Sequence, residues 1–279
     1  MSSEDLELLK FYHELGINST LVEFEEERLE IKENSELTRP FIVQSSDSVK
    51  KKGEDAVDLN FRHLNCTNKN IKKQESILFD CRIVEARRLA SKCNSIDELR
   101  SAILSFDGCD IKKTAINTVF SDGNPSAKIM LIGEAPGVNE DLQGVPFCGP
   151  SGTLLNKMLD AINLDYTKVY ISNAVFWRPP GNRKPTNLEL DMCRPFVEKH
   201  IALISPQILI LVGGIACYSL LDNTKTISAL RGRFHTYTNQ YLSNSITTAA
   251  IFHPAYLLRR PTQKRLAWED LKKIRDYLQ

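Results

Sequence analysis

Three short apolar runs in the sequence each end in residues that can take part in chemistry. These runs cover residues 129–132, 169–172 and 247–252. The first is followed by a glycine-rich turn, 133–137, whose backbone N–H groups can come close to a ligand. Asn173 follows the second run, and its amide offers a donor beside an acceptor for the edge of a nucleobase. His253 follows the third run and can donate a hydrogen bond to an oxygen that gains charge.

The neighbouring loops carry further residues suited to binding nucleic acid. Phe147 lies in a segment rich in proline and glycine, where an aromatic ring can stack on a base. Ser151 lies where a helix is predicted to begin, and a helix N-terminus favours an anion. Arg259 and Arg260 can hold phosphates, and Leu257 can enter a base stack. Taken one at a time, Phe147 is more often a core residue, Asn173 a turn residue and His253 a loop residue.

From Lys128 onward, the sequence alternates between predicted strands and predicted helices, which is typical of a parallel sheet with covering helices. The predicted buried strands are 129–132, 169–172, 208–212 and 247–252. The predicted helices are 152–162, 187–204, 214–221 and 261–278. The fold class is therefore α/β, with a three-layer α/β/α sandwich around a four-stranded parallel sheet. In such sheets, ligands bind outside the carboxyl ends of the strands.

The chain is predicted to consist of an acidic extension, residues 1–75, and a domain, residues 76–279. A short amphipathic helix is expected at residues 4–15, followed by a flexible linker with little periodicity. Residues 76–104 are predicted to be helical, with a break at which Ser95 caps the second part.

Charge and composition limit the class of protein. Residues 1–60 hold 15 acidic against 7 basic side chains, a balance of −8, whereas the remainder holds 20 against 29, a balance of +9. A basic domain suits a partner that carries phosphates. No apolar run approaches the roughly 18 residues of a membrane span, and seven cysteines, an odd number, do not form a secreted disulfide framework. We therefore expect a cytoplasmic protein without membrane association.

Four segments together resemble the motifs of type-4 uracil-DNA glycosylases. They read Gly-Glu-Ala-Pro-Gly from Gly133, Pro-Phe-Cys-Gly-Pro-Ser-Gly from Pro146, Arg-Pro-Pro-Gly-Asn-Arg from Arg178 and His-Pro-Ala-Tyr-Leu-Leu-Arg from His253. The resemblance runs from about Gly108 to the C-terminus, about 60% of the chain. It implies an enzyme of base-excision repair that hydrolyses the N-glycosidic bond of a flipped-out uracil in DNA.

The resemblance, together with the loop residues above, gives a set of candidate site residues. The implied catalytic residues are Glu134 and His253. The implied uracil-binding residues are Gly133, Ala135, Glu140, Phe147 and Asn173. The implied DNA-binding residues are Ser151, Arg178, Arg183, Leu257, Arg259 and Arg260.

The implied mechanism depends on a residue that the turn lacks. In the best-studied branch of the superfamily, an Asp orients water at the position that is Ala135 here. We therefore expect a dissociative cleavage, in which charge develops as a sugar cation and a uracil anion. The N–H groups of the 133–137 turn and the side chain of His253 would stabilise the anion. Glu134 would support the cation or position water.

The resemblance fails at the metal site. Type-4 enzymes hold a 4Fe–4S cluster on four cysteines, and the matching positions here are Phe106, Cys109, Trp177 and Cys193. Two thiolates cannot hold such a cluster in the usual way, and the two aromatic side chains are large enough to fill the vacated volume. We expect no cofactor and no bound metal, with Cys109 and Cys193 as remnants of the ligand set.

Two other functions remain open. A glycosylase for other deaminated bases, such as hypoxanthine, would differ in pocket width between Glu140 and Phe147. A non-catalytic DNA-binding or polymerase-associated module would keep the fold and lose the catalytic activity. The presence of Glu134, Asn173 and His253 argues against this alternative. We expect a monomer that acts on uracil-containing DNA. Its N-terminal helix can dock a replication or repair protein, although the acidic extension can also inhibit the site by mimicking DNA or be inert.

Overall fold

The computed structural model describes residues 81–221 and 224–279. The predicted helix at residues 4–15, the predicted linker and the predicted boundary at residue 75 lie outside the described residues. Within the described ranges, no helix is both long enough and apolar enough to cross a membrane. A cytoplasmic location and a monomeric state stay predictions.

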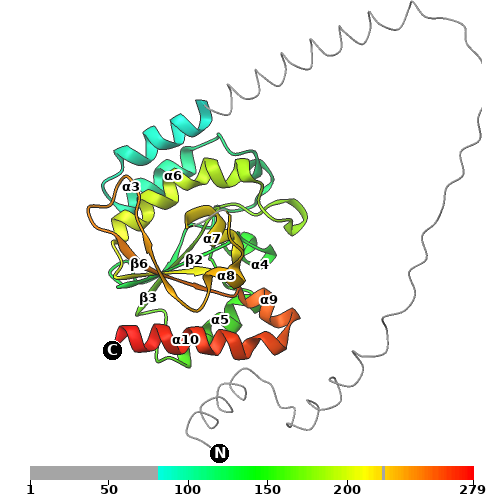
Figure 1. The fold of residues 1–279 in the computed structure, drawn as a ribbon. Helices are drawn as coiled ribbons and strands as arrows, with labels where there is room; N and C mark the ends of the chain where they lie inside the picture. The colour runs from blue at the N-terminus through cyan, green and yellow to red at the C-terminus, as the bar shows by residue number, and fades with distance from the viewer. Residues whose placement is uncertain (1–80, 222–223) are drawn as a thin grey trace, which may run out of the picture. The chain divides into compact units, whose positions relative to one another are not determined.

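A six-stranded mixed sheet forms the centre of the domain (Figure 1). In chain order, its strands are β1 (Asp122–Gly123), β2 (Ile129–Gly133), β3 (Val169–Asn173), β4 (Ile208–Val212), β5 (Phe234–Tyr237) and β6 (Ile246–Ile251). In space, the order is β1-β3-β2-β4-β6-β5. Strands β3, β2, β4 and β6 are parallel, which confirms the predicted four-stranded core. The antiparallel edge strands β1 and β5 were not predicted.

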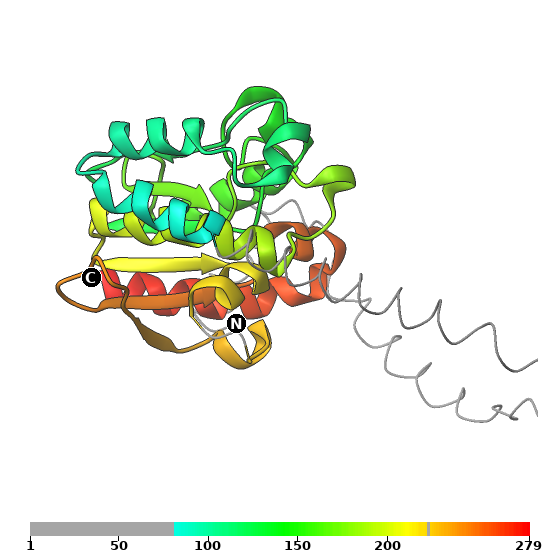
Figure 2. The same cartoon turned by 90° about the horizontal axis from the view of Figure 1, so that it is seen from above.

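Helices cover both faces of this sheet (Figure 2). Residues 81–92 are helical. The longer helices that follow are α3 (Ile96–Ser105), α5 (Pro150–Asp160), α6 (Asn187–Ile204) and α10 (Lys264–Leu278). The shorter helices are η4 (Asp110–Thr114), α4 (Val138–Gln143), η5 (Pro180–Asn182), α7 (Gly214–Leu220), α8 (Ile227–Leu230), α9 (Pro254–Arg259) and η6 (Pro261–Gln263). In Figure 1, α3 and α6 lie on one face of the sheet, and α5 and α10 lie on the other.

Alternate side chains of each central strand enter two separate hydrophobic cores. On β2, Met130 and Ile132 belong to the core that contains buried residues of α3 and α6. Ile129 and Leu131 belong to the core that contains buried residues of α5 and α10. Because both faces of the central strands are covered, these strands are mostly apolar, and the buried polar residues Ser172 and Asn173 come at the end of β3. This arrangement confirms the predicted three-layer sandwich.

Local sequence fixes where two of the longer helices begin. At the start of α3, the Ser95 hydroxyl accepts a hydrogen bond from the backbone N–H of Glu98 at 3.2 Å. At the start of α6, Thr186 Oγ1 accepts from the N–H of Glu189 at 3.3 Å, and the Glu189 carboxylate accepts from the N–H of Thr186 at 2.8 Å. Such caps satisfy N–H groups that have no partner within the helix. Both helices begin where the sequence predicts.

Candidate active site

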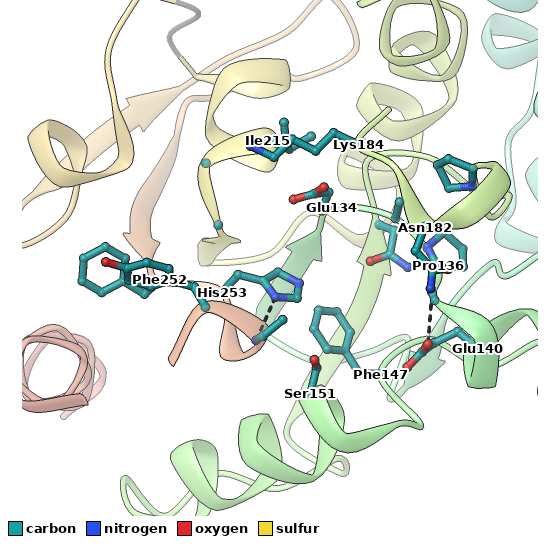
Figure 3. Close-up of a pocket in the computed structure, with 18 of the residues that line it drawn as sticks. Glu134, Pro136, Glu140, Phe147, Ser151, Asn182, Lys184, Ile215, Phe252 and His253 are labelled. Atoms are coloured by element: carbon teal, nitrogen blue, oxygen red, sulfur yellow. Dashed lines mark hydrogen bonds between the residues drawn. The ribbon is translucent and has the colours of Figure 1, made fainter. Parts of the chain in front are cut away.

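A groove of about 740 Å³ lies along the carboxyl ends of the parallel strands (Figure 3). It is the crevice in which an open α/β sheet is expected to bind its ligand. The predicted site residues that line it are Glu134, Ala135, Glu140, Phe147, Ser151, Asn173, Arg183, His253 and Arg259. The predicted site residues that do not line it are Gly133, Arg178, Leu257 and Arg260. The structure therefore brings together most of the set from distant parts of the chain.

Gly133 allows two side chains to meet at the floor of the groove. It ends β2 and is the register partner of Asn173, which ends β3. A Cβ atom on Gly133 would lie 2.4 Å from Oδ1 of Asn173 and 2.6 Å from Cζ of Phe147. Any larger residue would overlap both groups. Gly133 thus shapes the site from beneath, and Asn173, which is only 2% exposed, directs its amide into the groove.

Phe147 is held in a backbone conformation that is unfavourable for its residue type. Its φ of 53° lies in the left-handed region, which costs roughly 1–2 kcal/mol for a residue other than glycine. Helix α5 passes so close that a Cβ on Gly152 would lie 1.5 Å from the carbonyl oxygen of Phe147. The ring stacks beside that of His253, with 5.7 Å between the centroids and an interplanar angle of 28°. The result is a fixed aromatic wall in the groove.

Glu140 connects the two loops that form one side of the site. Its Oε2 atom accepts from the N–H of Gly137 at 3.0 Å, and its Oε1 atom accepts from the N–H of Gly149 at 2.9 Å. Figure 3 shows the carboxylate below Pro136. Hydrogen bonds to an ionised acceptor are among the stronger ones. Glu140 therefore lines the groove, as expected, and in addition ties the turn after β2 to the segment that carries Phe147.

The carboxyl group of Glu134 stands free in the groove. Among the residues that the structure describes, no group donates a hydrogen bond to it. Figure 3 shows Glu134 between Lys184 on one side and His253 on the other. Burial raises the pKa of this carboxyl above its ordinary value, and the charges of Lys184 and then Arg259 act in the opposite direction. Glu134 can therefore face a developing positive charge or hold a water molecule.

The imidazole of His253 is oriented by the helix that it starts. His253 is the N-cap of α9, and its Nδ1 atom accepts a hydrogen bond from the N–H of Ala255 at 3.2 Å. Burial, and then the charge of Arg259, lower the pKa of His253 to about 4. The ring is therefore neutral at pH 7, and because Nδ1 is an acceptor, the proton is on Nε2. His253 is thus a neutral hydrogen-bond donor.

Two arginines near the groove are held by acidic and amide partners. The Nε atom of Arg178 donates to Oδ1 of Asn182 at 2.6 Å, and an Nη atom lies 3.8 Å from the carboxylate of Asp141. Arg183 donates to both carboxylate oxygens of Glu189, at 2.9 Å and 2.6 Å. These bonds fix the shape of the segment between β3 and α6. A DNA phosphate would have to share the guanidinium groups with these partners.

The position of Leu257 in helix α9 contradicts its predicted contact with DNA. Leu257 is fully buried in the core on the α5 and α10 side of the sheet, so the expectation that it enters a base stack is wrong. Leu258, one position along the helix, is 46% exposed. Arg259 and Arg260 are also exposed at the end of this helix. The side chain available to a base stack is therefore that of Leu258.

The sequence did not single out several residues that line the groove. They are Asn182, Lys184, Ile215, Ile227, Ser228, Phe252 and Tyr256. Lys184 directly follows the Arg-Pro-Pro-Gly-Asn-Arg segment, so its position in the chain was a usable signal. Ile215 and Ser228 lie on α7 and α8, after β4, where no polar motif marks the sequence. For this part of the groove, the one usable signal was the rule that ligands bind at the carboxyl ends of the strands, here the end of β4.

The four positions expected for a metal cluster do not fit one. Phe106, Cys109, Trp177 and Cys193 are all buried in a single hydrophobic core. The side chains of Phe106 and Trp177 carry no atom that ligates iron, so only the thiols of Cys109 and Cys193 remain, where a 4Fe–4S cluster needs four thiolates. In the described part of the chain, no group of three or more His, Cys, Asp or Glu side chains is arranged to hold a metal ion.

Comparison with known proteins identifies the family of this chain. The profile of the Uracil DNA glycosylase superfamily matches residues 120–272. The type-4 uracil-DNA glycosylase of Archaeoglobus fulgidus is 38% identical over 184 residues, 64% of this chain and 92% of that protein. That of Sulfurisphaera tokodaii is 34% identical over 188 residues, 66% and 84% of the two chains. That of Thermotoga maritima is 33% identical over 173 residues, 61% and 88% of the two chains.

Proposed function

The chain belongs to the type-4 branch of the uracil-DNA glycosylase superfamily, and on this premise we propose that its groove removes uracil from DNA. The observation that carries the proposal is the meeting of Asn173, Phe147 and His253 in one groove, although they come from three separate segments. Together they offer a polar edge, a flat apolar face and a hydrogen-bond donor. These are the groups needed to bind a pyrimidine and to help it leave its sugar.

Recognition begins with a base that has left the DNA helix. A groove in a folded protein cannot reach a stacked base, so the nucleotide is flipped out at a cost of a few kcal/mol. The ring of Phe147 then stacks on the base. The amide of Asn173 pairs with the edge of uracil by donating one hydrogen bond and accepting another. Cytosine offers a different donor and acceptor pattern on that edge, so the same amide discriminates against it.

Bond cleavage places negative charge on the base. As the bond between C1′ and N1 breaks, its electron pair goes to uracil, and a carbonyl oxygen next to N1 gains charge. The Nε2–H group of His253 donates to that oxygen, and the backbone N–H groups after β2 add to the stabilisation. A donor fixed before the reaction is typically worth about 2.7–4 kcal/mol in the barrier. A neutral imidazole fits this task because it needs no proton transfer.

Glu134 acts on the sugar side of the reaction. With Ala135 next to it, the turn has no second carboxylate to orient water. The ionised Glu134 stabilises the sugar cation and accepts a proton from the water molecule that adds to C1′. Lys184 and Arg259 favour the ionised form of this carboxyl. Exposed Arg259, Arg260 and Leu258 contact the DNA around the flipped nucleotide.

The proposal is tested by release of uracil from a labelled single-stranded oligonucleotide. The wild-type protein is compared with Asn173→Ala and His253→Ala, and Asn156→Ala, on the exposed side of α5, is the matched control. We expect wild-type and control proteins to release uracil equally. Asn173→Ala should abolish release, and His253→Ala should slow it by about a hundredfold or more.

Oligonucleotides with hypoxanthine and with no modified base complete the experiment. Release of hypoxanthine but not uracil would replace the proposed substrate with another deaminated base. DNA binding without release of either base would contradict an enzyme and support the non-catalytic module. Folding of each variant is checked by its thermal midpoint, so that loss of activity is separated from loss of structure.

A further inference from the structure

The segment that forms one rim of the groove, residues 178–184, is anchored at Trp177. The indole Nε1–H of Trp177 donates to Oγ1 of Thr118 at 2.9 Å. Next to it, the N–H of Val119 donates to the carbonyl oxygen of Phe176 at 2.8 Å. These two bonds fasten the end of the β3 strand region to a stretch of chain more than fifty residues earlier. Residues 178–184 begin directly after this attachment.

The anchor lies within a group of buried aromatic side chains. Trp177 is 1% exposed, and its ring meets that of Phe176 edge to face, with 6.0 Å between the centroids. Phe106 and Phe196 form a second edge-to-face pair at 5.2 Å. A Cβ on Gly108 would lie 2.3 Å from Cζ of Phe106, so this ring is folded tightly over the backbone. Aromatic pairs of this kind add to the stabilisation from burial.

The same core contains Cys109 and Cys193, both 0% exposed. We infer that this metal-free aromatic core positions residues 178–184, and that Trp177 is the positioning residue that sets how the groove holds DNA. The rings fill the volume between the early segment and the groove rim, and the Trp177 to Thr118 bond fixes the orientation. The inference rests on the proposed function in that the groove must bind DNA, and only the kinetic test requires that it also releases uracil.

If Trp177 positions residues 178–184, a change at Trp177 should affect DNA binding more than bond cleavage. Residues 178–184 supply Arg183 and Lys184 to the rim, whereas Asn173 and His253 belong to other segments. Loosening Trp177 should therefore weaken the grip on DNA. On the alkaline plateau of the pH–rate profile, where the charge of Lys184 no longer decides whether Glu134 is ionised, the maximal rate should stay nearly unchanged. A general loss of structure would lower the amount of active protein without moving the concentration at which DNA saturates it.

The experiment uses the full-length protein with two variants and one control. Trp177→Phe keeps an aromatic ring but removes the Nε1–H donor, and Thr118→Val removes the acceptor of the same bond. Trp268→Phe makes the same substitution in the other core, where Trp268 is 4% exposed. Excision at a fixed low protein concentration and increasing concentrations of uracil-containing DNA gives the half-saturating DNA concentration and the maximal rate. Fluorescence anisotropy with an unmodified oligonucleotide measures affinity independently.

We expect each of the two variants to raise the half-saturating concentration about fivefold, the equivalent of one hydrogen bond worth about 1 kcal/mol. The maximal rate should change by less than about twofold, and the double variant should be no worse than either single variant. Trp268→Phe should leave the half-saturating concentration unchanged. An unchanged half-saturating concentration in Trp177→Phe, or an equal increase in Trp268→Phe, would overturn the role of Trp177.

Metal content is measured on the same wild-type preparation, produced with added iron. We expect a colourless protein with almost no iron. About four iron atoms per chain would overturn the metal-free core. If the wild-type protein released no uracil, the proposed function would fail, while the iron content and the anisotropy measurements would still test this inference.

Discussion

The hydrogen bond between His253 and Ala255 gives one ring two connected roles. The Nδ1 atom caps α9, and this bond leaves the proton on Nε2, where it faces the groove. A protonated ring would carry hydrogens on both nitrogens and would lose the cap. Protonation would therefore cost the cap of α9. Burial also disfavours the charged ring and lowers its pKa to about 4, so both effects favour the neutral ring. The orientation and the protonation state of His253 therefore depend on the start of α9.

Lys184 gives a test of the environment of Glu134. Because its charge lowers the pKa of Glu134, Lys184→Met should raise that pKa. If the ionised carboxyl is the active form, activity is lost as pH falls through this pKa. The acidic limb of the pH–rate profile should therefore move to higher pH in Lys184→Met. The measurement is the single-turnover rate between pH 4.5 and 8 at saturating protein.

Lys184→Arg is the matched control for this change, since it keeps the positive charge at the groove. It should leave the acidic limb in place. Identical limbs in wild type and Lys184→Met would contradict the coupling between the two side chains. A parallel drop at every pH would instead indicate that Lys184 contacts DNA.

The residue types after three strands were enough to predict Glu134, Asn173 and His253 as neighbours, because the carboxyl ends of parallel strands converge at one edge. Lys184 could not be predicted in the same way. It lies in an extended stretch after a turn at Gly181, where φ is 63°. That turn brings both Arg183 and Lys184 to the groove, and the sequence does not determine its course.

Helix α9 shows how strongly a contact depends on helical phase. Leu257 and Leu258 are adjacent and identical, yet one is fully buried and the other is 46% exposed. Leu258→Ala should slow excision from double-stranded DNA more than from single-stranded DNA. Only in the duplex does the flipped nucleotide leave a gap in the base stack that the Leu258 side chain can fill. The ratio of the two single-turnover rates measures this effect.

Leu257→Ala serves as the contrasting variant. Removal of a fully buried leucine should lower the free energy of unfolding by about 2–5 kcal/mol, measured by urea denaturation. It should leave the ratio between duplex and single-strand rates unchanged. A change of that ratio in Leu257→Ala, and not in Leu258→Ala, would show that α9 turns to present the other leucine when DNA binds.

The central strands were predictable and the edge strands were not, for a physical reason. Strands β2, β3 and β4 are buried along their whole length, so each contains an apolar run, which in β3 is followed by Ser172 and Asn173. Strand β1 has two residues, and β5 has a single buried residue, so neither gives such a pattern. Helices α4 and α9 were missed because they lie inside segments whose glycines and prolines indicated loops.

Buried histidine couples the stability of the whole domain to pH. His200 is fully buried, its Nδ1 atom has no partner, and its Nε2 atom shares a hydrogen bond with the hydroxyl of Tyr170 at 2.8 Å. Burial lowers its pKa to about 3, whereas an unfolded chain has an ordinary value near 6.5. Between these two values, the unfolded state binds a proton that the folded state does not. Stability therefore falls as pH decreases from about 6.5 toward about 3.

His200→Gln isolates this contribution. The amide keeps a partner for Tyr170 and does not titrate. Wild type should lose about 2 kcal/mol more free energy of unfolding than His200→Gln between pH 7 and pH 5. Urea denaturation at both pH values measures the difference. Other groups, including Asp270, whose pKa burial raises to about 6, are common to both proteins and cancel. Equal losses in the two proteins would contradict the neutral, buried state of His200.

The bonds from Glu140 to Gly137 and Gly149 bear on which DNA we expect to be processed fastest. Since both loops are fixed before a base arrives, capture spares the roughly 1–2 kcal/mol that ordering each backbone residue requires. The remaining barrier to capture is the opening of the DNA itself, a few kcal/mol in a duplex. Uracil in a single strand should thus enter most readily, uracil opposite guanine less so, and uracil opposite adenine least. We therefore expect the strength of the base pair, more than any contact with the protein, to rank these substrates by rate of excision.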